Sequence, residues 1–470
     1  MLFLNRADEL GRLRELSRRR EGGLAVVYGR RRIGKTRLLL EWVAGRAGLY
    51  TVADLSAPAI QRRTVALAIA ERLPGFADVE YPDWFSLLRR LSSEALHAKW
   101  RGPLVFDELP YLVVTSPELP SVLQRWLDHE AKQARLVVAL AGSSQRMMQG
   151  LVLSPEAPLF GRASVILNLG PMPIVHLARA LGRASPRETL ARWTAWGGVP
   201  RYWELAASER GSTPTRVDRL VLDPNGALHG EPDRLLLEDA VPAAEVRPLL
   251  DAIGAGAHRV SEIAGRMGRP ATSLSRPLER LVGMGLVRRE HPFGEPERGG
   301  KRSLYRIDDP FFRLWFRVVA ARRALLAGGT PASRRALLER HWPALLAASW
   351  EDLARVRGPR AGALGTLHLG PAQRWWSGNA PEWDIVAESR AGKLLLLGEA
   401  KWSERPLSSA ALERTCRSLD SRLEPPVGAR YAKYERRRVL FVVDVEPGAP
   451  RKVGGVQVIT GRELLAAKGE

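Results

Sequence analysis

The sequence predicts an α/β protein of several domains, because three regions of its 470 residues differ in their pattern of apolar and polar residues. Over residues 1–240, short apolar runs alternate with amphipathic helical stretches, which is typical of a parallel sheet covered by helices. Residues 241–310 have the pattern of three helices and two short strands around a turn rich in glycine and proline. From residue 311, an apolar helical segment studded with arginines leads into a second α/β unit that continues to residue 470.

The composition favours a soluble, cytoplasmic protein with a polyanionic partner. Hydrophobic residues make up 45% of the chain and charged residues 26%, enough to build sizeable cores. We expect no signal peptide and no membrane helix, because no apolar run reaches the roughly 18 residues that a spanning helix needs. The formal net charge of +21 points to nucleic acid as a partner. A GC-rich genome would also enrich arginine, and the sequence leaves that alternative open.

A glycine-rich loop follows the first apolar run of the chain. Residues 24–28 read LAVVY, residues 29–36 read GRRRIGKT, and residues 37–43 continue as a helical run. In this context of strand, loop and helix, the pattern G-x-x-x-x-G-K-[ST] binds nucleotide phosphates. Lys35 is expected to bridge the β- and γ-phosphates, and Thr36 to bind Mg²⁺. The predicted cofactors are ATP and Mg²⁺, and the predicted nucleotide-binding residues are Gly29, Arg30, Arg31, Arg32, Ile33, Gly34, Lys35, Thr36 and Arg37.

Polar residues follow two further apolar runs. The apolar run at residues 103–106 is followed by Asp107 and Glu108. We expect Asp107 to hold the water shell of Mg²⁺ and Glu108 to act as the general base. The alternative is that this acidic pair is only a solvated strand end. Residues 136–141 lead to Ser143, a candidate sensor of the γ-phosphate or the attacking water, or else part of a helix cap. Arg162 is a candidate arginine finger in cis or from a neighbouring subunit, or else an ordinary salt-bridge residue.

Taken together, these motifs resemble the archaeal-type ATPase family, in the AAA+ and STAND-related branch of P-loop NTPases. The segments that carry the resemblance are FLNR at 3–6 with Glu9 and Leu10, YGRRRIGKT at 28–36, VFDELPY at 105–111, AGSS at 141–144, Gly161 with Arg162, and WGGVPRY at 196–202. The resemblance implies a P-loop ATPase domain over residues 1–240, with an adenine pocket near residues 3–10. It also implies a small helical lid at about residues 170–240.

The middle region has the order of a winged helix-turn-helix. Helical stretches at 247–254, 260–267 and 271–284 precede strands at 286–290 and 303–307, with residues 292–302 as the wing. In such a fold the third helix can enter the major groove of duplex DNA while the wing contacts phosphates. The predicted DNA-facing residues are Thr272, Ser273, Ser275, Arg276 and Arg280 on the helix, and Arg298, Lys301 and Arg302 on the wing. A protein connector without DNA contact is the alternative.

Two strands near residue 390 bring acidic residues together. Asp384 lies in a short strand at 383–387, and Glu399 and Lys401 share one face of a longer strand at 393–401, because residues two apart in a strand point the same way. A hairpin would bring Asp384 to the same end. Two carboxylates and a lysine can bind Mg²⁺ and activate water against a phosphodiester. Glu351, on a preceding helix, can supply a further carboxylate.

This pattern resembles the PD-(D/E)xK nuclease superfamily, with its restriction-endonuclease-like fold, over residues 311–470. It also resembles the domain of unknown function that follows the ATPase in many archaeal-type ATPases. Asp384 matches the first acidic position, Glu399 and Lys401 match the second motif, and Glu351 matches the helical glutamate by position only. Trp383 stands where the superfamily often has proline. A degenerate domain used for binding or dimerisation is the alternative.

The sequence therefore predicts a Mg²⁺-dependent ATPase that acts on nucleic acid, whose ATP state controls the placement of a nuclease-like domain. A STAND-like regulatory or signalling ATPase with a C-terminal domain that binds without cleaving is the second hypothesis. A homo-oligomer is compatible with either. The predicted catalytic residues are Lys35, Glu108, Asp384, Glu399 and Lys401, and the predicted metal ligands are Thr36, Asp107, Glu351, Asp384 and Glu399.

Overall fold

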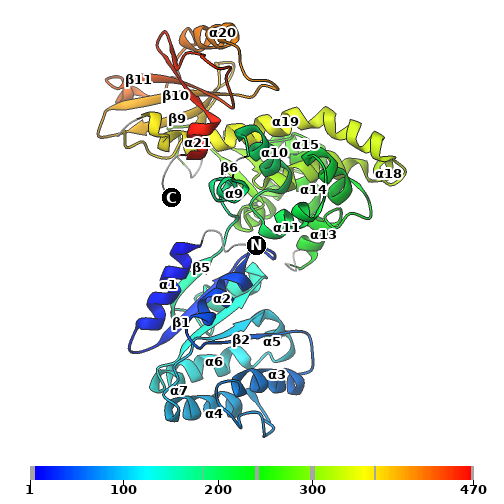
Figure 1. Ribbon diagram of the computed structural model, residues 1–470, viewed down its shortest axis with the longest axis vertical. Helices are drawn as coiled ribbons and strands as arrows, with labels where there is room; N and C mark the ends of the chain where they lie inside the picture. Colours follow the sequence, from blue (N-terminus) through cyan, green and yellow to red (C-terminus); the bar gives the residue numbers. More distant parts are fainter. Residues whose placement is uncertain (1–5, 183, 239–242, 297–301, 365–366, 467–470) are drawn as a thin grey trace. The chain divides into compact units, whose positions relative to one another are not determined.

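The computed structural model describes residues 6–182, 184–238, 243–296, 302–364 and 367–466 (Figure 1). The chain divides into two compact units. The first consists of residues 1–172 with 199–201 and 237–240, and the second of residues 173–198, 202–236 and 241–470. In the part of the chain that the structure describes, no helix has the length and apolar character that crossing a membrane requires.

The first unit is built on a parallel sheet of five strands in the order β2-β3-β4-β1-β5. The strands are β1 (Gly23–Tyr28), β2 (Leu49–Val52), β3 (Leu104–Asp107), β4 (Val137–Gly142) and β5 (Ala163–Asn168). The helices are α1 (Ala7–Arg18), α2 (Lys35–Ala44), α3 (Pro58–Ala70), α4 (Trp84–His97), α5 (Leu109–Thr115), α6 (Leu119–Asp128), α7 (Glu130–Gln133) and α8 (Gln145–Val152). Every residue of β3 and β4 is buried, as expected for inner strands covered on both faces. The predicted α/β fold with a parallel sheet is confirmed.

The strand order determines which loops meet. β4 lies between β1 and β3, so the segments that follow these three strands emerge side by side at the carboxyl edge of the sheet. These segments contain Gly29, Glu108 and Ser143. The arrangement therefore places the glycine loop, the acidic pair and the candidate sensor at one edge.

The second unit begins with helices that the sequence analysis assigned to the lid. These segments are α9 (Ile174–Leu181), α10 (Pro186–Trp196), α11 (Pro200–Ser208), α12 (Thr213–Val217), the π-helix η1 (Asp218–Leu222) and α13 (Glu231–Glu238). The division of the chain differs from the predicted boundary at residue 240, because most of residues 173–236 fall in the second unit. The cause is apolar packing: Leu190 of α10 shares a buried cluster with Leu346 and Trp350 of α19 (Pro331–Arg357).

Helices and a hairpin follow in the middle of the chain. They are α14 (Ala243–Gly254), α15 (Val260–Met267), the 3-10 turn η2 (Ala271–Leu274), α16 (Ser275–Gly283), β6 (Val287–Glu290) and β7 (Leu304–Ile307). The two strands pair in antiparallel fashion, with Val287 opposite Ile307. The Glu262 carboxylate accepts the N–H groups of His258 (2.9 Å) and Arg259 (3.1 Å), which explains why α15 begins at Val260.

The C-terminal part of the second unit is a mixed sheet of six strands in the order β12-β13-β11-β10-β9-β8. The strands are β8 (Gln373–Trp375), β9 (Trp383–Ser389), β10 (Leu394–Lys401), β11 (Glu435–Val442), β12 (Lys452–Val453) and β13 (Val456–Thr460). The remaining segments are α17 (Pro310–Leu314), η3 (Trp315–Val319), η4 (Ala320–Arg322), α18 (Arg323–Ala327), η5 (Gly358–Arg360), η6 (Gly362–Leu364), α20 (Ser409–Asp420), η7 (Ala429–Tyr431) and α21 (Gly461–Ala466). Strands β9 and β10 form an antiparallel pair, whereas β10, β11 and β13 run parallel. One apolar cluster joins the sheet to α19, and a second joins it to α20.

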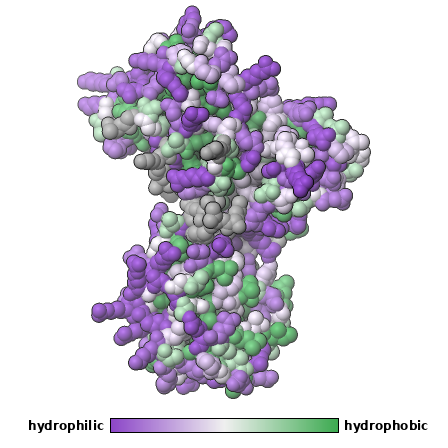
Figure 2. Space-filling view, in the orientation of Figure 1, coloured by the Kyte–Doolittle hydropathy of each residue, from purple (hydrophilic) through white to green (hydrophobic). Residues whose placement is uncertain are grey.

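The surface is largely hydrophilic in the view of Figure 2, with apolar side chains gathered on the first unit. Its exposed apolar residues include Leu55 (66% exposed), Ile60 (59%) and Leu67 (52%). These residues lie on α3 and on the loop that precedes it. Exposed apolar surface of this kind is often a contact surface for a partner.

Candidate functional sites

The glycine loop fits a polyphosphate. Gly29 has a φ of +148° and Gly34 a φ of +101°, which L side chains rarely adopt. A Cβ atom on Gly29 would lie 2.4 Å from the carbonyl oxygen of Leu169, so only glycine can occupy this position. The buried Lys35 side chain folds back over the loop, where its Nζ donates to the carbonyls of Gly29 (2.8 Å) and Arg30 (3.2 Å). The Lys35 ammonium and the N–H groups at the N-terminus of α2 thus face the same loop. Together they form a set of hydrogen-bond donors that suits a phosphate.

The other residues of the predicted loop differ in what they offer. Ile33 is 1% exposed, which leaves only its backbone for a ligand. Arg30 is buried, whereas Arg32 and Arg37 are exposed. Arg31 Nε donates to the hydroxyl of Ser143 at 3.3 Å, and its guanidinium also contacts the Tyr111 hydroxyl. The loop is therefore linked directly to the segment that follows β4.

Asp107 is held by donors from two elements. The Thr36 hydroxyl donates to Asp107 Oδ2 at 3.0 Å, and the Tyr50 hydroxyl donates to the same oxygen at 2.5 Å. Asp107 is 2% exposed, and its Oδ1 accepts the N–H of Glu108 at 2.9 Å. Burial, followed by the Asp107 carboxylate, raises the pKa of Tyr50, which keeps its hydroxyl a donor. Tyr50 lies on β2, and the sequence did not identify it as a site residue. Nothing in the pattern of this four-residue strand indicates that the tyrosine hydroxyl bonds to a distant carboxylate.

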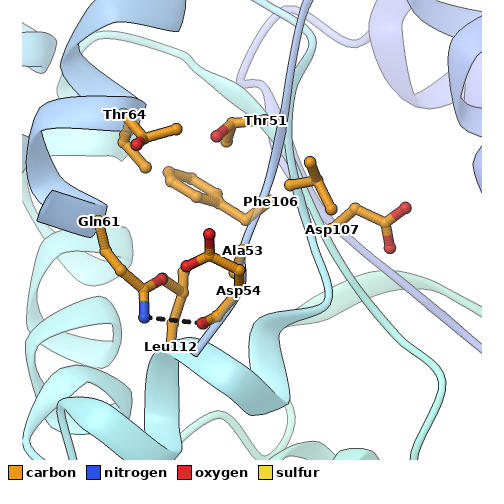
Figure 3. Close-up of a pocket in the computed structure, with 10 residues that line it drawn as sticks. Thr51, Ala53, Asp54, Gln61, Thr64, Phe106, Asp107 and Leu112 are labelled. Carbon is orange, nitrogen blue, oxygen red and sulfur yellow. Dashed lines mark hydrogen bonds between the residues drawn. The ribbon is translucent and has the colours of Figure 1, made fainter. Parts of the chain in front are cut away.

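A small pocket borders this carboxylate. It is lined by the ends of β2 and β3 together with α3 and α5, including Thr51, Phe106 and Gln61. In Figure 3 the Asp107 carboxylate points away from the pocket. The buried Gln61 amide donates to the carbonyl of Asp54 at 3.0 Å and so ties the segment after β2 to α3. The residues that line the pocket thus hold the ends of β2 and β3 together on the side of Asp107 away from its carboxylate.

Glu108 is oriented by Ser143. The Glu108 carboxylate accepts the Ser143 hydroxyl at 2.7 Å and the Ser143 N–H at 3.1 Å. The backbone of Glu108 has a φ of +54°, a conformation that is rare for residues other than glycine and is often found at functional positions. The predicted helix cap belongs to the next residue, because Ser144 accepts the N–H of Met147 at the start of α8. Ser143 therefore links the candidate base to the glycine loop through Arg31.

Arg162 lies at the other edge of the sheet. It directly precedes β5, whose first residue pairs with Leu24 at the start of β1, whereas the glycine loop follows the end of β1. At about 3.3 Å per residue, the length of β5 separates Arg162 from the loop by roughly 20 Å. Arg162 instead forms an ion pair with Asp128 at 2.8 Å. Arg162 therefore forms a salt bridge in this structure and does not reach the γ-phosphate site of its own chain. A contact with the nucleotide of a neighbouring subunit stays a prediction.

In the C-terminal sheet, Asp384 and Glu399 come together. Asp384 on β9 accepts the N–H of Ala400 on β10 at 3.0 Å, which holds its carboxylate at the residue next to Glu399. Burial raises the pKa of Glu399, Arg422 opposes this, and the charge and hydrogen bonding of Asp384 add to it. Arg422 donates to Glu399 at 2.6 Å.

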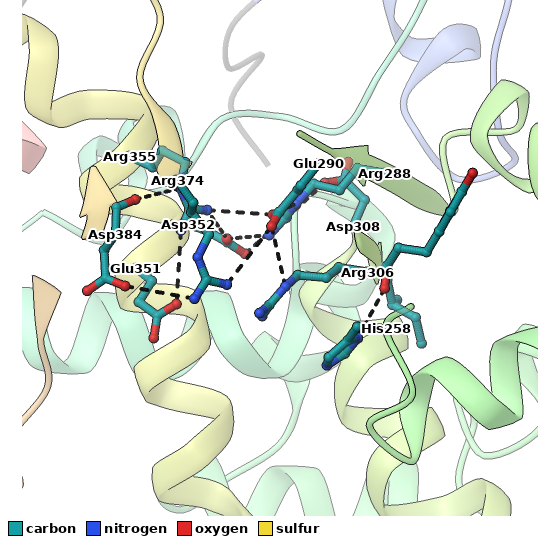
Figure 4. A network of polar contacts seen from close by, with 12 residues as sticks. His258, Arg288, Glu290, Arg306, Asp308, Glu351, Asp352, Arg355, Arg374 and Asp384 are labelled. Atoms are coloured by element: carbon teal, nitrogen blue, oxygen red, sulfur yellow. Dashed lines mark hydrogen bonds and ion pairs between the residues drawn. The ribbon is translucent and has the colours of Figure 1, made fainter. Parts of the chain in front are cut away.

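Glu351 and Lys401 have different surroundings. Glu351 lies on α19, and Figure 4 shows it beside Asp384. Burial and then the charge of Asp384 raise the pKa of Glu351 to about 7. Lys401 stands two residues beyond Glu399 on β10 and is exposed. The structure thus brings Glu351, Asp384 and Glu399 close to each other, whereas Lys401 at the end of β10 is exposed to solvent.

The carboxylates are nevertheless not arranged as metal ligands. Among residues 6–466 as far as they are described, no three or more His, Cys, Asp or Glu side chains are placed to hold a metal ion. Cations of the protein stand there instead: Arg422 pairs with Glu399, and Arg374 Nη2 lies 3.9 Å from Asp384. In this geometry guanidinium groups pair with two of the three carboxylates, Asp384 and Glu399, so the metal site at Glu351, Asp384 and Glu399 stays a prediction.

The predicted wing packs against the C-terminal sheet. Phe293 is 7% exposed and lies in an apolar cluster with Trp375 and Tyr431, and its N–H donates to the carbonyl of Arg374 at 2.7 Å. Arg302 donates to Ser377 at 2.6 Å and pairs with Glu295. Arg298 and Lys301 lie outside the described residues. Of the residues predicted to face DNA, those of η2 and α16 are exposed: Thr272, Ser273, Ser275, Arg276 and Arg280.

Comparison with known proteins agrees with the site of the first unit. Residues 3–205 match the model of an ATPase domain found predominantly in Archaea. Residues 315–415 match a domain of archaeal and bacterial proteins of unknown function. An uncharacterized protein of Methanocaldococcus jannaschii, MJECL04, is 25% identical over 405 residues, which cover 86% of this chain and 88% of that protein.

The Walker-type ATPase PABY2304 of Pyrococcus abyssi is similar in fold, with a TM-score of 0.52 and 19% identity over 67% of this chain and 96% of that one. The ORC2 protein of Aeropyrum pernix gives a TM-score of 0.40 and 16% identity over 73% of this chain and 95% of that one. The first of these similarities shows the fold. Residues 3–205 are thus similar to an ATPase domain of the archaeal type, and residues 315–415, which include strands β8 to β10 of the C-terminal sheet, to a domain of unknown function.

Proposed function

We propose that the protein is a Mg²⁺-dependent ATPase that acts on nucleic acid. The observation that carries the ATPase proposal is the grouping of four side chains at one edge of the sheet. Lys35 closes the glycine loop, Thr36 bonds to Asp107, and Glu108 follows Asp107 at the end of β3. The match of residues 3–205 to an ATPase domain supports the same reaction.

Each side chain has a distinct role in this proposal. The Lys35 ammonium would exchange its loop carbonyls for phosphate oxygens, and the loop amides would bind the remaining oxygens. Thr36 and Asp107 would hold Mg²⁺, which supplies positive charge for the oxygens of the transferred phosphoryl group. Glu108 would accept a proton from the attacking water. The Ser143 hydroxyl donates to Glu108 at 2.7 Å, which gives the carboxylate a defined direction.

The test is ATP hydrolysis by the full chain and by the Lys35→Ala variant. Loss of the ammonium should abolish turnover and weaken nucleotide binding. Arg12→Ala, which removes an exposed cation of α1, is the matched control and should retain the parental rate. A Lys35→Ala protein that hydrolyses ATP at the parental rate would refute the assignment of this site.

The nucleic-acid proposal rests on charge and on the exposed face of α16. The net charge is +21, and Arg276 and Arg280 stand on the solvent side of the helix that follows the turn η2. Arrangement of helices α14 to α16 and the hairpin as a winged helix would direct this face to the major groove of duplex DNA. The wing residue Arg302 is already engaged by Ser377 and Glu295, so we assign the contact to the helix, where Arg276 is exposed and Arg280 would exchange its 3.1 Å pairing with Glu245 for a phosphate.

A second activity is proposed for the C-terminal sheet. Asp384 and Glu399 meet on neighbouring strands with Glu351 nearby, which supports phosphodiester cleavage with Mg²⁺ once Arg422 and Arg374 release the carboxylates. The nucleotide state of the first unit would control access to this site. Nicking of plasmid DNA by the full chain, with and without ATP, and by Asp384→Asn is the test. DNA that binds but is never nicked would favour the STAND-like alternative, in which this domain binds a partner without cleaving it.

A further inference from the structure

A cleft of about 520 Å³, lined mainly by charged residues, lies within the second unit between the hairpin and the C-terminal sheet. Its lining comes from β6, α19, the start of β8 and the segment after β7. The basic members are Arg288, Arg289, His291, Arg355 and Arg374, and the acidic members are Glu290, Asp308 and Asp352. The volume lies in the range of cavities that hold small ligands of nucleotide size.

The arginines of this cleft are not equally satisfied. Arg288 is saturated: it pairs with Asp352 at 2.5 Å, Glu290 at 2.7 Å and Asp308 at 3.1 Å. The Arg374 side chain is only 9% exposed, yet its Nη1 has no hydrogen-bond partner and stands 4.0 Å from Glu290. Buried guanidinium donors without an acceptor are costly, because they have lost water and gained nothing in return. Arg374 therefore has unused donor capacity at the wall of the cleft.

Two neighbours of Arg374 show the same deficit. Nη2 of Arg355 is buried without a hydrogen-bond partner and lies 4.0 Å from Glu351, whereas its Nη1 donates to Asp352 at 3.1 Å. Arg306 Nε is likewise buried without a hydrogen-bond partner, and it lies 3.4 Å from the same Glu290 oxygen that Arg374 approaches. In Figure 4 the guanidinium groups of Arg306 and Arg374 both reach towards the single carboxylate of Glu290. Arg288 and Arg355 pair with the same carboxylate, so four guanidinium groups share Glu290. Asp352 balances part of this charge through Arg288 and Arg355, and Glu382 accepts from Nη2 of Arg374 at 3.3 Å.

We propose that this cleft binds a phosphate group, with Arg374 and Arg355 as its donors. A guanidinium presents paired N–H groups that match two oxygens of a phosphate. Binding requires Arg374 to exchange its loose pairing with Glu290 for phosphate oxygens. The proposal goes beyond the ATP site, since all of these residues belong to the second unit. The phosphate can come from a mononucleotide or from the backbone of a nucleic acid, and the experiment below separates the two.

The experiment uses the full chain with Lys35→Ala, so that the loop of the first unit has lost its phosphate-binding ammonium. Inorganic phosphate is titrated by calorimetry. Arg374→Met and Arg355→Met should each weaken phosphate binding by about tenfold or more, because each removes a charge-assisted donor. Arg390→Met is the matched control, because the Arg390 side chain is 84% exposed on the same sheet domain, and it should bind as the parent does. Equal binding by the parent and both cleft variants would overturn the proposal.

A variant with the opposite expectation guards against loss of folding. Glu290→Gln removes the carboxylate that competes for Arg374, so phosphate binding should become several-fold tighter, which a misfolded protein cannot do. Unchanged or weaker binding by Glu290→Gln, or no binding of phosphate to the Lys35→Ala chain, would also overturn the proposal. Competition by AMP but not by duplex DNA would identify a free nucleotide, and the reverse result a backbone phosphate. ATP hydrolysis by Arg374→Met in the chain with Lys35 intact separates a failure here from a failure of the ATPase proposal.

Discussion

The Tyr50 hydroxyl offers a direct test of the Mg²⁺ site that we propose in the first unit. Tyr50 donates to Asp107 Oδ2 at 2.5 Å, and Thr36 donates to the same oxygen at 3.0 Å. If Thr36 turns to the metal, Tyr50 is the donor that keeps the Asp107 carboxylate in position. Tyr50→Phe removes this donor and preserves the ring, so it changes the orientation of Asp107 without opening the core.

The magnitude follows from the nature of the bond. A hydrogen bond to a charged group contributes about 1.5–3 kcal/mol, which corresponds to roughly 10- to 150-fold in an equilibrium constant. Asp107 keeps the N–H of Glu108 on its other oxygen at 2.9 Å, so part of its orientation survives. We therefore expect the lower end of that range: the Mg²⁺ concentration for half-maximal ATP hydrolysis should rise about tenfold.

The assay is ATP hydrolysis at saturating ATP over a titration of Mg²⁺. The Tyr50→Phe protein should regain nearly the parental turnover at saturating Mg²⁺, because the chemical groups Lys35 and Glu108 are intact. Tyr434→Phe is a matched control, since its hydroxyl donates to Glu388 at 2.9 Å in the other unit. An unchanged Mg²⁺ requirement would refute the reasoning, and so would a loss of turnover that Mg²⁺ cannot restore.

Three further predictions address the other sites. Glu108→Gln should bind ATP and leave it uncleaved in a filter-binding assay, because the amide keeps the shape but cannot accept the proton; parental turnover would show that another group is the base. Removing Arg276 and Arg280 together should lower the salt dependence of duplex DNA binding by about two in the log–log slope, and a slope equal to that of the parent would exclude α16 as the contact. Burial and Asp384 raise the pKa of Glu351 from 4.5 to about 7. The folded protein therefore favours the protonated acid, and stability is lost as pH rises from about 4.5 through 7, by at most about 3 kcal/mol. Urea unfolding of Glu351→Gln in EDTA should show a flatter pH dependence over that window, and an unaltered dependence would contradict the assignment.

Local patterns account for the parts that the sequence predicted well. The glycine loop, the strand before it and the helix after it are contiguous, so residues 24–43 contain their own evidence. The same holds for Asp107 and Glu108 at the end of an apolar run, and for the alternation that puts Glu399 and Lys401 on one side of β10. These features depend on spacing along the chain and need no knowledge of what packs against them.

The remaining features depend on contacts between distant segments. Tyr50 reaches Asp107 across 57 positions of the chain, and Arg162 pairs with Asp128 across 34. Arg374 lies near Asp384 and Glu290 only because β8 is placed between β9 and the hairpin. No periodicity marks such pairings, so arginines that the sequence showed as a diffuse excess turned out to neutralise particular carboxylates.

The burial of Phe293 also bears on how this protein can be divided or recombined. A cut at residue 310 looks natural along the chain, since it falls between the hairpin and the helices that lead to the C-terminal sheet. In space, however, the hairpin donates an aromatic ring to that sheet domain, with its centroid 5.6 Å from that of Tyr431. Loss of a buried phenylalanine typically costs about 3–5 kcal/mol. Exchange of the C-terminal region between related proteins should therefore succeed only when the hairpin is transferred with it. The segment that must be exchanged as a whole begins before β6, and not after β7.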